Sequence, residues 1–200
     1  MYNFRTDLAV ERNDIYKHQN NLQNDADGIE VENEEKEDIK ISRVKVLNDN
    51  GEQAIGKRKG TYITIDIKNL KIAGEDEIQK ASEAVTKELK NLIGALVGPQ
   101  EDILVVGLGN LYVTPDALGP KVVNEIDITR HLLNYMPDVL DKDTRPVSAI
   151  APGVLGTTGI ETLEVIKGIV ENIHPKLIIV IDALASRSIE RISSTVQLSD

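Results

Sequence analysis

The fold is decided by two apolar runs, ILVVGLGN at residues 103–110 and LIIVIDALAS at residues 177–186. Each contains an unbroken series of mostly β-branched residues, which is typical of a central strand in a parallel sheet covered on both faces. Ligands of such sheets bind beyond the carboxyl ends of the strands. The first run leads to Asp116 and the second reaches Asp182, so we expect both carboxylates to face one crevice. Two carboxylates in one crevice are the smallest set of groups that can act as the acid and the base of a hydrolysis reaction.

Strand and helix patterns alternate outward from these two runs. Apolar residues at three- and four-residue spacing predict a helix over residues 75–97, which Gly98-Pro99 ends. The remaining pattern predicts a helix from Leu118 to Leu133, a strand at Val147–Ile150, a helix from Ile160 to Ile173, a short helix from Ser186 and a last strand near residues 196–200. This alternation predicts an α/β fold with a mostly parallel central sheet flanked by helices.

The N-terminal part has a different pattern. Residues 1–38 are polar and strongly acidic from Asn24 onward, which predicts a mobile or loosely attached arm. Alternating residues predict half-buried strands over 39–46 and 62–67, with a turn at 48–51, so this part is β-rich. The basic loop Gly56–Gly60 is either a solvated loop or a lip that steers an acidic peptide.

Composition excludes several classes of function. The net charge of −10 over 200 residues disfavours a nucleic-acid partner and an anionic membrane surface. The absence of cysteine excludes disulfides, thiolate metal sites and a cysteine nucleophile. No apolar stretch approaches the ~18 residues that span a bilayer, and the first residues lack the apolar core of a signal peptide, so we expect a cytoplasmic protein.

Glycine-rich segments follow two of the predicted strands. Gly107-Leu108-Gly109 lacks the third glycine of a dinucleotide fingerprint, because Tyr112 stands there, so nucleotide binding is disfavoured. These glycines instead allow the backbone to approach a ligand or an adjacent loop. The loop Gly153–Gly159 has two interpretations: its N–H groups line a peptide groove or hold a developing oxyanion, or it is a connector that caps the following helix.

Alternatives stay open for the other candidate residues. Asp116 after Thr114-Pro115 fits a helix N-cap as well as a catalytic acid. The three histidines, His18, His131 and His174, share no metal-site spacing, and no serine lies in a Gly-x-Ser-x-Gly elbow. We therefore expect no cofactor and no metal, and a classical serine hydrolase is unsupported.

Four blocks carry a family resemblance: GLGNLYVTPDALGP at residues 107–120, APGVLGTTGIET at 151–162, IDALASRSIER at 181–191 and RTDLAVE at 5–11. They resemble the germination proteases of spore-forming bacteria, and the resemblance extends from Arg5 to Asp200. Such proteases run past the point where this chain ends. The resemblance therefore implies a prosegment over residues 1–7 and an incomplete α/β peptidase domain over residues 8–200.

The resemblance implies an endopeptidase that degrades small acid-soluble spore proteins during germination, located in the cytoplasm of the forespore or spore core. It implies a self-processing zymogen of atypical aspartic type, assembled as a homotetramer, with no direct nucleic-acid or membrane partner. The family's catalytic aspartates match Asp116 and Asp182, and the self-cleavage site matches the bond between Asp7 and Leu8. Substrate-binding residues are expected at the strand ends: Gly109, Asn110, Gly153, Gly156 and Thr157.

A more distant likeness suggests a second chemistry. The chain is similar to hydrogenase maturation endopeptidases, which carry a Gly-x-Gly-Asn block, an acidic residue where Asp116 stands and a strand-terminal aspartate like Asp182. In that family these carboxylates bind the nickel of the substrate together with a histidine, which has no clear counterpart here. The alternative function is therefore a metal-dependent carboxylate peptidase.

Overall fold

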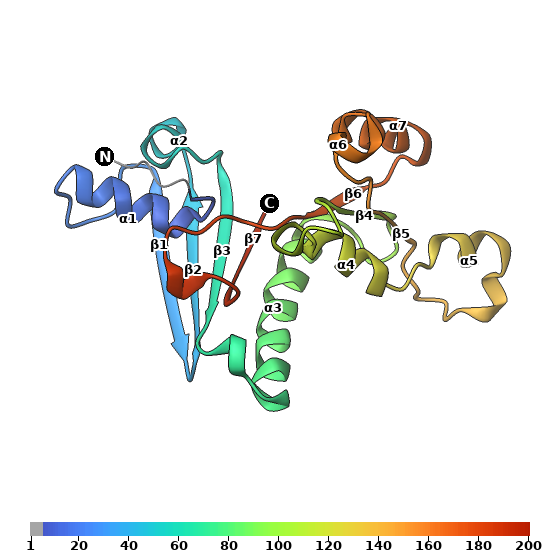
Figure 1. The fold of residues 1–200 in the computed structure, drawn as a ribbon, viewed down its shortest axis with the longest axis horizontal. Helices are drawn as coiled ribbons and strands as arrows, with labels where there is room; N and C mark the ends of the chain where they lie inside the picture. Colours follow the sequence, from blue (N-terminus) through green and yellow to red (C-terminus); the bar gives the residue numbers. More distant parts are fainter. Residues whose placement is uncertain (1–5) are drawn as a thin grey trace. The chain divides into compact units, whose positions relative to one another are not determined.

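The computed structural model describes residues 6–200, and these divide into two compact units. Residues 6–93 and 184–200 form the first unit, and residues 94–183 form the second. The second unit is thus an insertion, in sequence, between two parts of the first. Figure 1 shows the secondary structure of both units.

The first unit is built on an antiparallel sheet of four strands in the order β1-β2-β3-β7. The strands are β1 (Ile29–Lys36), β2 (Ile39–Val46), β3 (Gly60–Ile67) and β7 (Thr195–Ser199). The last strand pairs with β3 in a register that places Val196 opposite Ile65. The expected strands at 39–46, 62–67 and the C-terminal end are therefore confirmed, and the last of them belongs to the antiparallel sheet.

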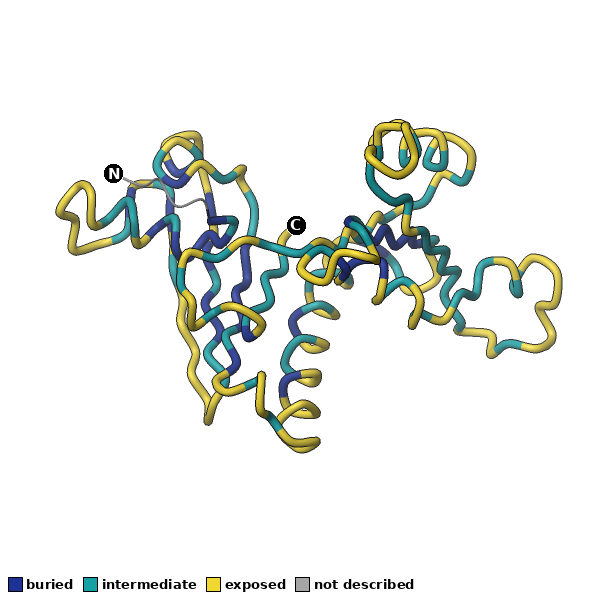
Figure 2. The backbone as a smooth tube through the Cα atoms, viewed as in Figure 1, coloured by how far each residue is buried: buried dark blue, intermediate teal, exposed yellow. Residues whose placement is uncertain are grey.

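Alternating side chains of this sheet build two apolar clusters. Figure 2 marks the buried residues of the backbone in dark blue. One cluster joins Ile63, Ile65 and Ile67 of β3 to α3 (Glu75–Leu96) through Ala81 and Val85. The other gathers Val44, Val46 and Tyr62 with the first turn of α1 (Ala9–Gln19) and with Ile55 of α2 (Asp49–Ile55); its members are Leu8, Ala9, Val10, Ala26, Ile29, Val44, Val46, Ile55 and Tyr62. The helix expected over residues 75–97 is confirmed.

Two expectations for the N-terminal part are wrong. Residues 9–36 are not an arm but α1 and β1, because the first turn of α1 is buried and the acidic strand β1 faces the basic residues Arg43 and Lys45 of β2. Residues 48–51 are not a turn between strands: the Asn48 side chain accepts a hydrogen bond from the Gly51 N–H at 3.0 Å and caps α2. Residues 1–5, part of the predicted prosegment, lie outside the described residues.

The second unit contains a parallel sheet of three strands in the order β5-β4-β6. The strands are β4 (Ile103–Gly107), β5 (Val147–Ile150) and β6 (Leu177–Ile181). The unit's helices are α4 (Leu118–Glu125), α5 (Arg130–Tyr135), α6 (Leu155–Thr158) and α7 (Thr162–Ile173). The mixed α/β class, with a parallel sheet, flanking helices and a β-rich N-terminal part, is confirmed.

Three predicted helices differ from the structure. The helix expected from Leu118 to Leu133 is two helices, because Thr129 is bound to β5: its N–H donates to the Val147 carbonyl at 3.1 Å and its Oγ1 accepts from the Val147 N–H at 2.9 Å. The helix expected from Ile160 begins at Thr162, after a left-handed Gly159 ends α6. The short helix expected from Ser186 is a single 3-10 turn, Ile189–Arg191. No helix within residues 6–200 is long and apolar enough to cross a membrane.

Candidate active site

The candidate site lies at the carboxyl edge of the parallel sheet. Strand β4 is central, with β5 on one side and β6 on the other, so the loops that follow all three strands leave from the same edge. Gly107 of β4 is level with Ile181 of β6, which places Leu108 level with Asp182. The Leu108 N–H donates to the Ile181 carbonyl at 2.8 Å. The two strand ends therefore stay paired up to the residue before Asp182.

Asp116 is held to the end of β4 by the backbone of Asn110. It lies in a 3-10 turn, Thr114–Asp116, and the Asn110 N–H donates both to its carboxylate Oδ2 at 2.8 Å and to its carbonyl at 3.0 Å. The backbone nitrogens of Leu108 and Asn110 are at most about 7 Å apart. The Leu108 amide binds the residue before Asp182, and the Asn110 amide binds Asp116. These two contacts therefore bring the Asp116 loop close to the end of β6.

Two glycines make this approach possible. Gly109 has φ +110°, and a Cβ there would lie 2.0 Å from the Asp116 carbonyl oxygen. A Cβ on Gly119, in the first turn of α4, would lie 2.5 Å from the carbonyl oxygen of Ile181. Both distances are far below van der Waals contact, so neither position accepts a side chain without displacing backbone. The sequence predicts that glycines at this place allow the backbone to approach a ligand or an adjacent loop, and the geometry of Gly109 agrees with that prediction.

The two aspartates have different surroundings. Asp182 is exposed, and its Oδ1 accepts a hydrogen bond from the Ala183 N–H at 2.8 Å. Asp116 is half-buried, and the residue before α4, Ala117, provides no side-chain cap, so Asp116 does not cap that helix. Neither carboxylate is therefore committed to a helix N-terminus, and Asp182 is open to a substrate from solvent.

The loop after β5 contains the remaining predicted substrate-binding residues. Gly153 is left-handed at φ +79°, and its carbonyl accepts from the Thr162 hydroxyl at 3.2 Å. The Thr157 N–H and hydroxyl both donate to the Val154 carbonyl at 2.9 Å, and Gly156 is exposed. The Thr157 amide is thus used within its own turn, which leaves the neighbouring backbone of Gly153 and Gly156 as the candidate contacts for a peptide.

The predicted self-cleavage residues lie in the first unit. Asp7 pairs with Ala185: the Asp7 N–H donates to the Ala185 carbonyl, and the Ala185 N–H donates to the Asp7 carboxylate, each at 2.8 Å. The Gln197 side-chain amide donates to the Asp7 carbonyl at 3.2 Å. Leu8 is fully buried and Thr6 is 1% exposed. The bond between Asp7 and Leu8 is therefore concealed in this structure.

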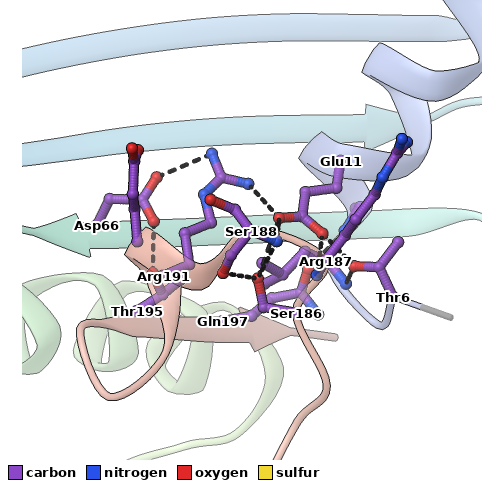
Figure 3. A network of polar contacts seen from close by, with 12 residues as sticks. Thr6, Glu11, Asp66, Ser186, Arg187, Ser188, Arg191, Thr195 and Gln197 are labelled. Carbon is purple, nitrogen blue, oxygen red and sulfur yellow. Dashed lines mark hydrogen bonds and ion pairs between the residues drawn. The ribbon is translucent and has the colours of Figure 1, made fainter. Parts of the chain in front are cut away.

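Glu11 anchors the segment around this bond (Figure 3). Its Oε2 accepts from the Thr6 hydroxyl at 2.5 Å and from the Arg187 N–H at 2.9 Å. Its Oε1 accepts from the Ser186 hydroxyl and the Ser188 N–H, and forms an ion pair with Arg191 at 3.3 Å. Burial raises the pKa of Glu11, but the hydrogen bonds from Thr6, Arg187 and Ser188 lower it more, so the net pKa lies below its ordinary value.

Sequence reasoning missed this role of Glu11. A glutamate in the first turn of a helix is common, and the residues that contact Glu11, apart from Thr6, lie 175 or more positions away. Its place in the block RTDLAVE was the one available signal. Within residues 6–200 no group of three or more histidine, aspartate or glutamate side chains has the geometry of a metal site.

Comparison with known proteins agrees with the resemblance carried by the four blocks. The family model of the germination proteases matches residues 6–200. The chain is 48% identical to a germination protease of Clostridium acetobutylicum and 51% identical to one of Clostridium perfringens, covering 100% of this chain and 61% of each relative. It is 46% identical to the germination protease of Priestia megaterium, covering 55% of that protein. The chain belongs to the germination protease family and spans about three-fifths of its relatives' length.

Proposed function

We propose that this chain carries the active site of an endopeptidase that degrades small acid-soluble spore proteins during germination, in the cytoplasm of the forespore or spore core. Membership of the germination protease family supports the reaction class. One observation carries the site: Asp116 and Asp182 follow the adjacent parallel strands β4 and β6 at the carboxyl edge of one sheet. Ligands of open α/β sheets bind at that edge.

The proposed chemistry is hydrolysis by an activated water. One aspartate is ionised and takes a proton from water, and the other is protonated and donates a hydrogen bond to the scissile carbonyl. The hydroxide equivalent adds to the carbonyl carbon, the C–N bond breaks, and the amine leaves with a proton. The glycine backbone at Gly109, Gly153 and Gly156 is proposed to hold the substrate chain. Asn110 and Thr157, expected from the sequence in the same role, already donate their N–H groups within the protein, so they are proposed to contact the substrate through other atoms.

The experiment that tests this function compares Asp116→Asn, Asp182→Asn and the double variant in the full-length protein. Turnover of a spore-protein substrate is measured alongside thermal unfolding, with Asp127→Asn, at an exposed position, as the control. Each single variant is expected to lose about 10²–10⁴ in rate with its fold intact. The double variant is expected to be little worse, because the pair acts as a unit. Asp116→Asn with more than about a third of normal turnover, far above that range, would reject the dyad.

The same assay separates the metal-dependent alternative. The sequence has no cysteine and no histidine pair at metal-site spacing, so activity is expected to survive a strong chelator. Activity that is lost in chelator and restored by one specific metal ion would instead favour a carboxylate peptidase of the hydrogenase-maturation type.

We further propose that the protein is a self-processing zymogen that assembles as a homotetramer and releases residues 1–7. The block RTDLAVE supports the bond after Asp7 as the site. Because this bond is concealed here, self-cleavage requires the segment to leave its contacts with Ala185 and Gln197. Incubation of the full-length protein is expected to give Leu8 as the new N-terminus, and Asp7→Lys is expected to block this. N-terminal sequencing that finds another first residue would reject the site.

A further inference from the structure

Thr6 and Asp7 occupy a polar cradle in the first unit, formed by Glu11, Lys57, Ala185 and Gln197. Ala185 contacts Asp7 twice, once through its carbonyl and once through its N–H, so the backbone and the carboxylate of Asp7 are both held. Gln197 spans the predicted bond: its Nε2 donates to the Asp7 carbonyl at 3.2 Å, and its Oε1 accepts from the Ala9 N–H at 2.8 Å.

The cradle contacts side chains, and therefore distinguishes sequences. The Thr6 hydroxyl donates to the Glu11 carboxylate, which is itself a buried acceptor held by backbone N–H groups. Only a residue with a small hydroxyl donor fits this position, which is 1% exposed. The Ala185 N–H selects a carboxylate oxygen in the next residue.

Lys57 adds positive charge beside that carboxylate. Burial lowers the pKa of Lys57, and the negative charge of Asp7 opposes that lowering. Lys57 lies in the basic loop Gly56–Gly60. The sequence allows two interpretations of this loop, and one of them is a lip that steers an acidic peptide. A cation at this place favours aspartate or glutamate over a neutral residue after the threonine.

All four cradle residues lie in residues 8–200, so they remain when residues 1–7 are cut off. The departure of Thr6 and Asp7 would leave the hydrogen-bonding groups of Glu11, Ala185 and Gln197 that contact them open to another peptide. We propose that the cradle of the processed chain is a peptide-binding site that recognises a threonine followed by an acidic residue. This inference rests on the proposed self-processing, and its ligand is either the released segment or a substrate strand with the same Thr-Asp or Thr-Glu pair.

The direct test uses a chain that begins at Leu8, released from a cleavable fusion and checked for folding by circular dichroism. Binding of the heptapeptide Met-Tyr-Asn-Phe-Arg-Thr-Asp is measured by calorimetry. Saturable binding is expected, and a peptide with Thr6→Val or Asp7→Asn is expected to bind at least about tenfold more weakly. The first loses the hydroxyl that donates to Glu11, and the second keeps an acceptor for the Ala185 N–H but loses the negative charge that strengthens this hydrogen bond. In the protein, Gln197→Leu is expected to weaken binding, while Gln53→Leu, at an exposed position of α2, is expected to leave it unchanged.

A peptide with Asp7→Glu, blocked at both ends, distinguishes the two sources of ligand. Binding equal to that of the free heptapeptide identifies a site for internal Thr-acidic pairs of a substrate. Binding of the free heptapeptide alone identifies a product site that needs the new terminal carboxylate. Failure of every peptide to bind the folded chain, or equal binding of the Thr6→Val peptide, overturns the inference.

A second measurement uses the full chain and requires no truncated protein. An added endoproteinase that cuts after acidic residues is expected to cleave slowly after Asp7, because the residues on both sides of it, Thr6 and Leu8, are buried. Thr6→Val and Gln197→Leu are expected to raise that rate by about tenfold, and Gln53→Leu is not. Equal rates in all variants overturn the inference. Neither measurement needs self-cleavage, so a failure of the proposed processing appears separately, in the N-terminal sequence of the incubated protein.

Discussion

Replacement of Glu11 by glutamine is the sharpest test of how the N-terminal segment is held. The variant keeps the size of the side chain but removes its charge and one acceptor oxygen. If the amide oxygen takes the place of Oε1, where Ser186, Ser188 and Arg191 contact it, the amide nitrogen faces the Arg187 N–H. One backbone donor then has no acceptor, and Arg191 loses one of its two carboxylate partners, the other being Asp66.

The expected loss follows from these contacts. An unsatisfied donor in a largely buried site costs about 1–3 kcal/mol, and a hydrogen bond to a charged group contributes about 1.5–3 kcal/mol. The Glu11 side chain is 9% exposed, so solvent provides little compensation. We therefore expect Glu11→Gln to lower the free energy of unfolding by about 2–3 kcal/mol, or roughly 5–10 °C in Tm for a chain of this size. Urea unfolding at pH 7 measures it, with Glu190→Gln, an exposed glutamate of the same loop, as the control.

The pH dependence gives a second check on the same residue. The folded-state pKa of Glu11 is depressed, so its stabilising effect is present above the ordinary carboxyl value of 4.5 and is lost as the pH falls through the folded value. The difference in unfolding free energy between the natural protein and Glu11→Gln should therefore be constant from pH 7 to about pH 5 and shrink below that. A difference that persists unchanged into strong acid, or a variant as stable as Glu190→Gln, would refute the role given to this carboxylate.

Two further predictions concern packing. The ion pair of Arg43 with Glu88, 2.6 Å long with Glu88 3% exposed, joins β2 to α3, so Arg43→Met alone is expected to cost about 3–5 kcal/mol by leaving the buried Glu88 carboxylate unpaired. Glu88→Met is expected to cost less, because Arg43 keeps Glu32 and Glu34 as partners, and the double variant is expected to regain most of the loss of Arg43→Met. Urea unfolding of all three variants checks this, and additive losses would contradict it. Gly119→Ala is expected to destabilise the protein, because its Cβ would lie 2.4 Å from the Leu108 carbonyl oxygen, whereas Gly168→Ala, with no atom within 4 Å in the middle of α7, is expected to stabilise it by about 0.5–1 kcal/mol. A Gly119→Ala protein as stable as the Gly168→Ala protein would contradict this, because it would show that the backbone at Leu108 and Ile181 moves at little cost in free energy.

The second unit was largely predictable from sequence because its signals are local. The runs at β4 and β6 are short, apolar and β-branched. The parallel sheet buries β4 completely, but β6 is an edge strand on which Ile178 and Val180 are exposed, so the prediction of a central strand covered on both faces is wrong for β6. Once those strands are placed, the carboxyl edge and its two aspartates follow from the general geometry of α/β sheets. The break between α4 and α5 was not predictable, because it depends on hydrogen bonds between Thr129 and Val147, residues that lie on different elements.

The first unit was less predictable because its elements depend on distant partners. Helix α1 has no regular apolar stripe: its buried residues lie in its first turn and at Asn13, so periodicity does not reveal it. Strand β1 is acidic and resembles a solvated arm until the basic residues of β2 are placed opposite. The same is true of Glu11, whose role exists only when residues 186–191 lie against it. Sequence patterns record periodicity, and these features are pairings between remote segments.

The position of β7 has a consequence for how the protein is made. Asp7 and its partner Gln197 are 190 residues apart, so the ribosome must add that stretch of chain before the contact can form. At roughly 5–20 residues per second, translation takes about 10–40 s to cover that distance. The inserted residues 94–183 emerge complete within that time and can fold first. During synthesis, therefore, the peptide around Asp7 and Leu8 stays without these contacts until residues 185–197 have been made.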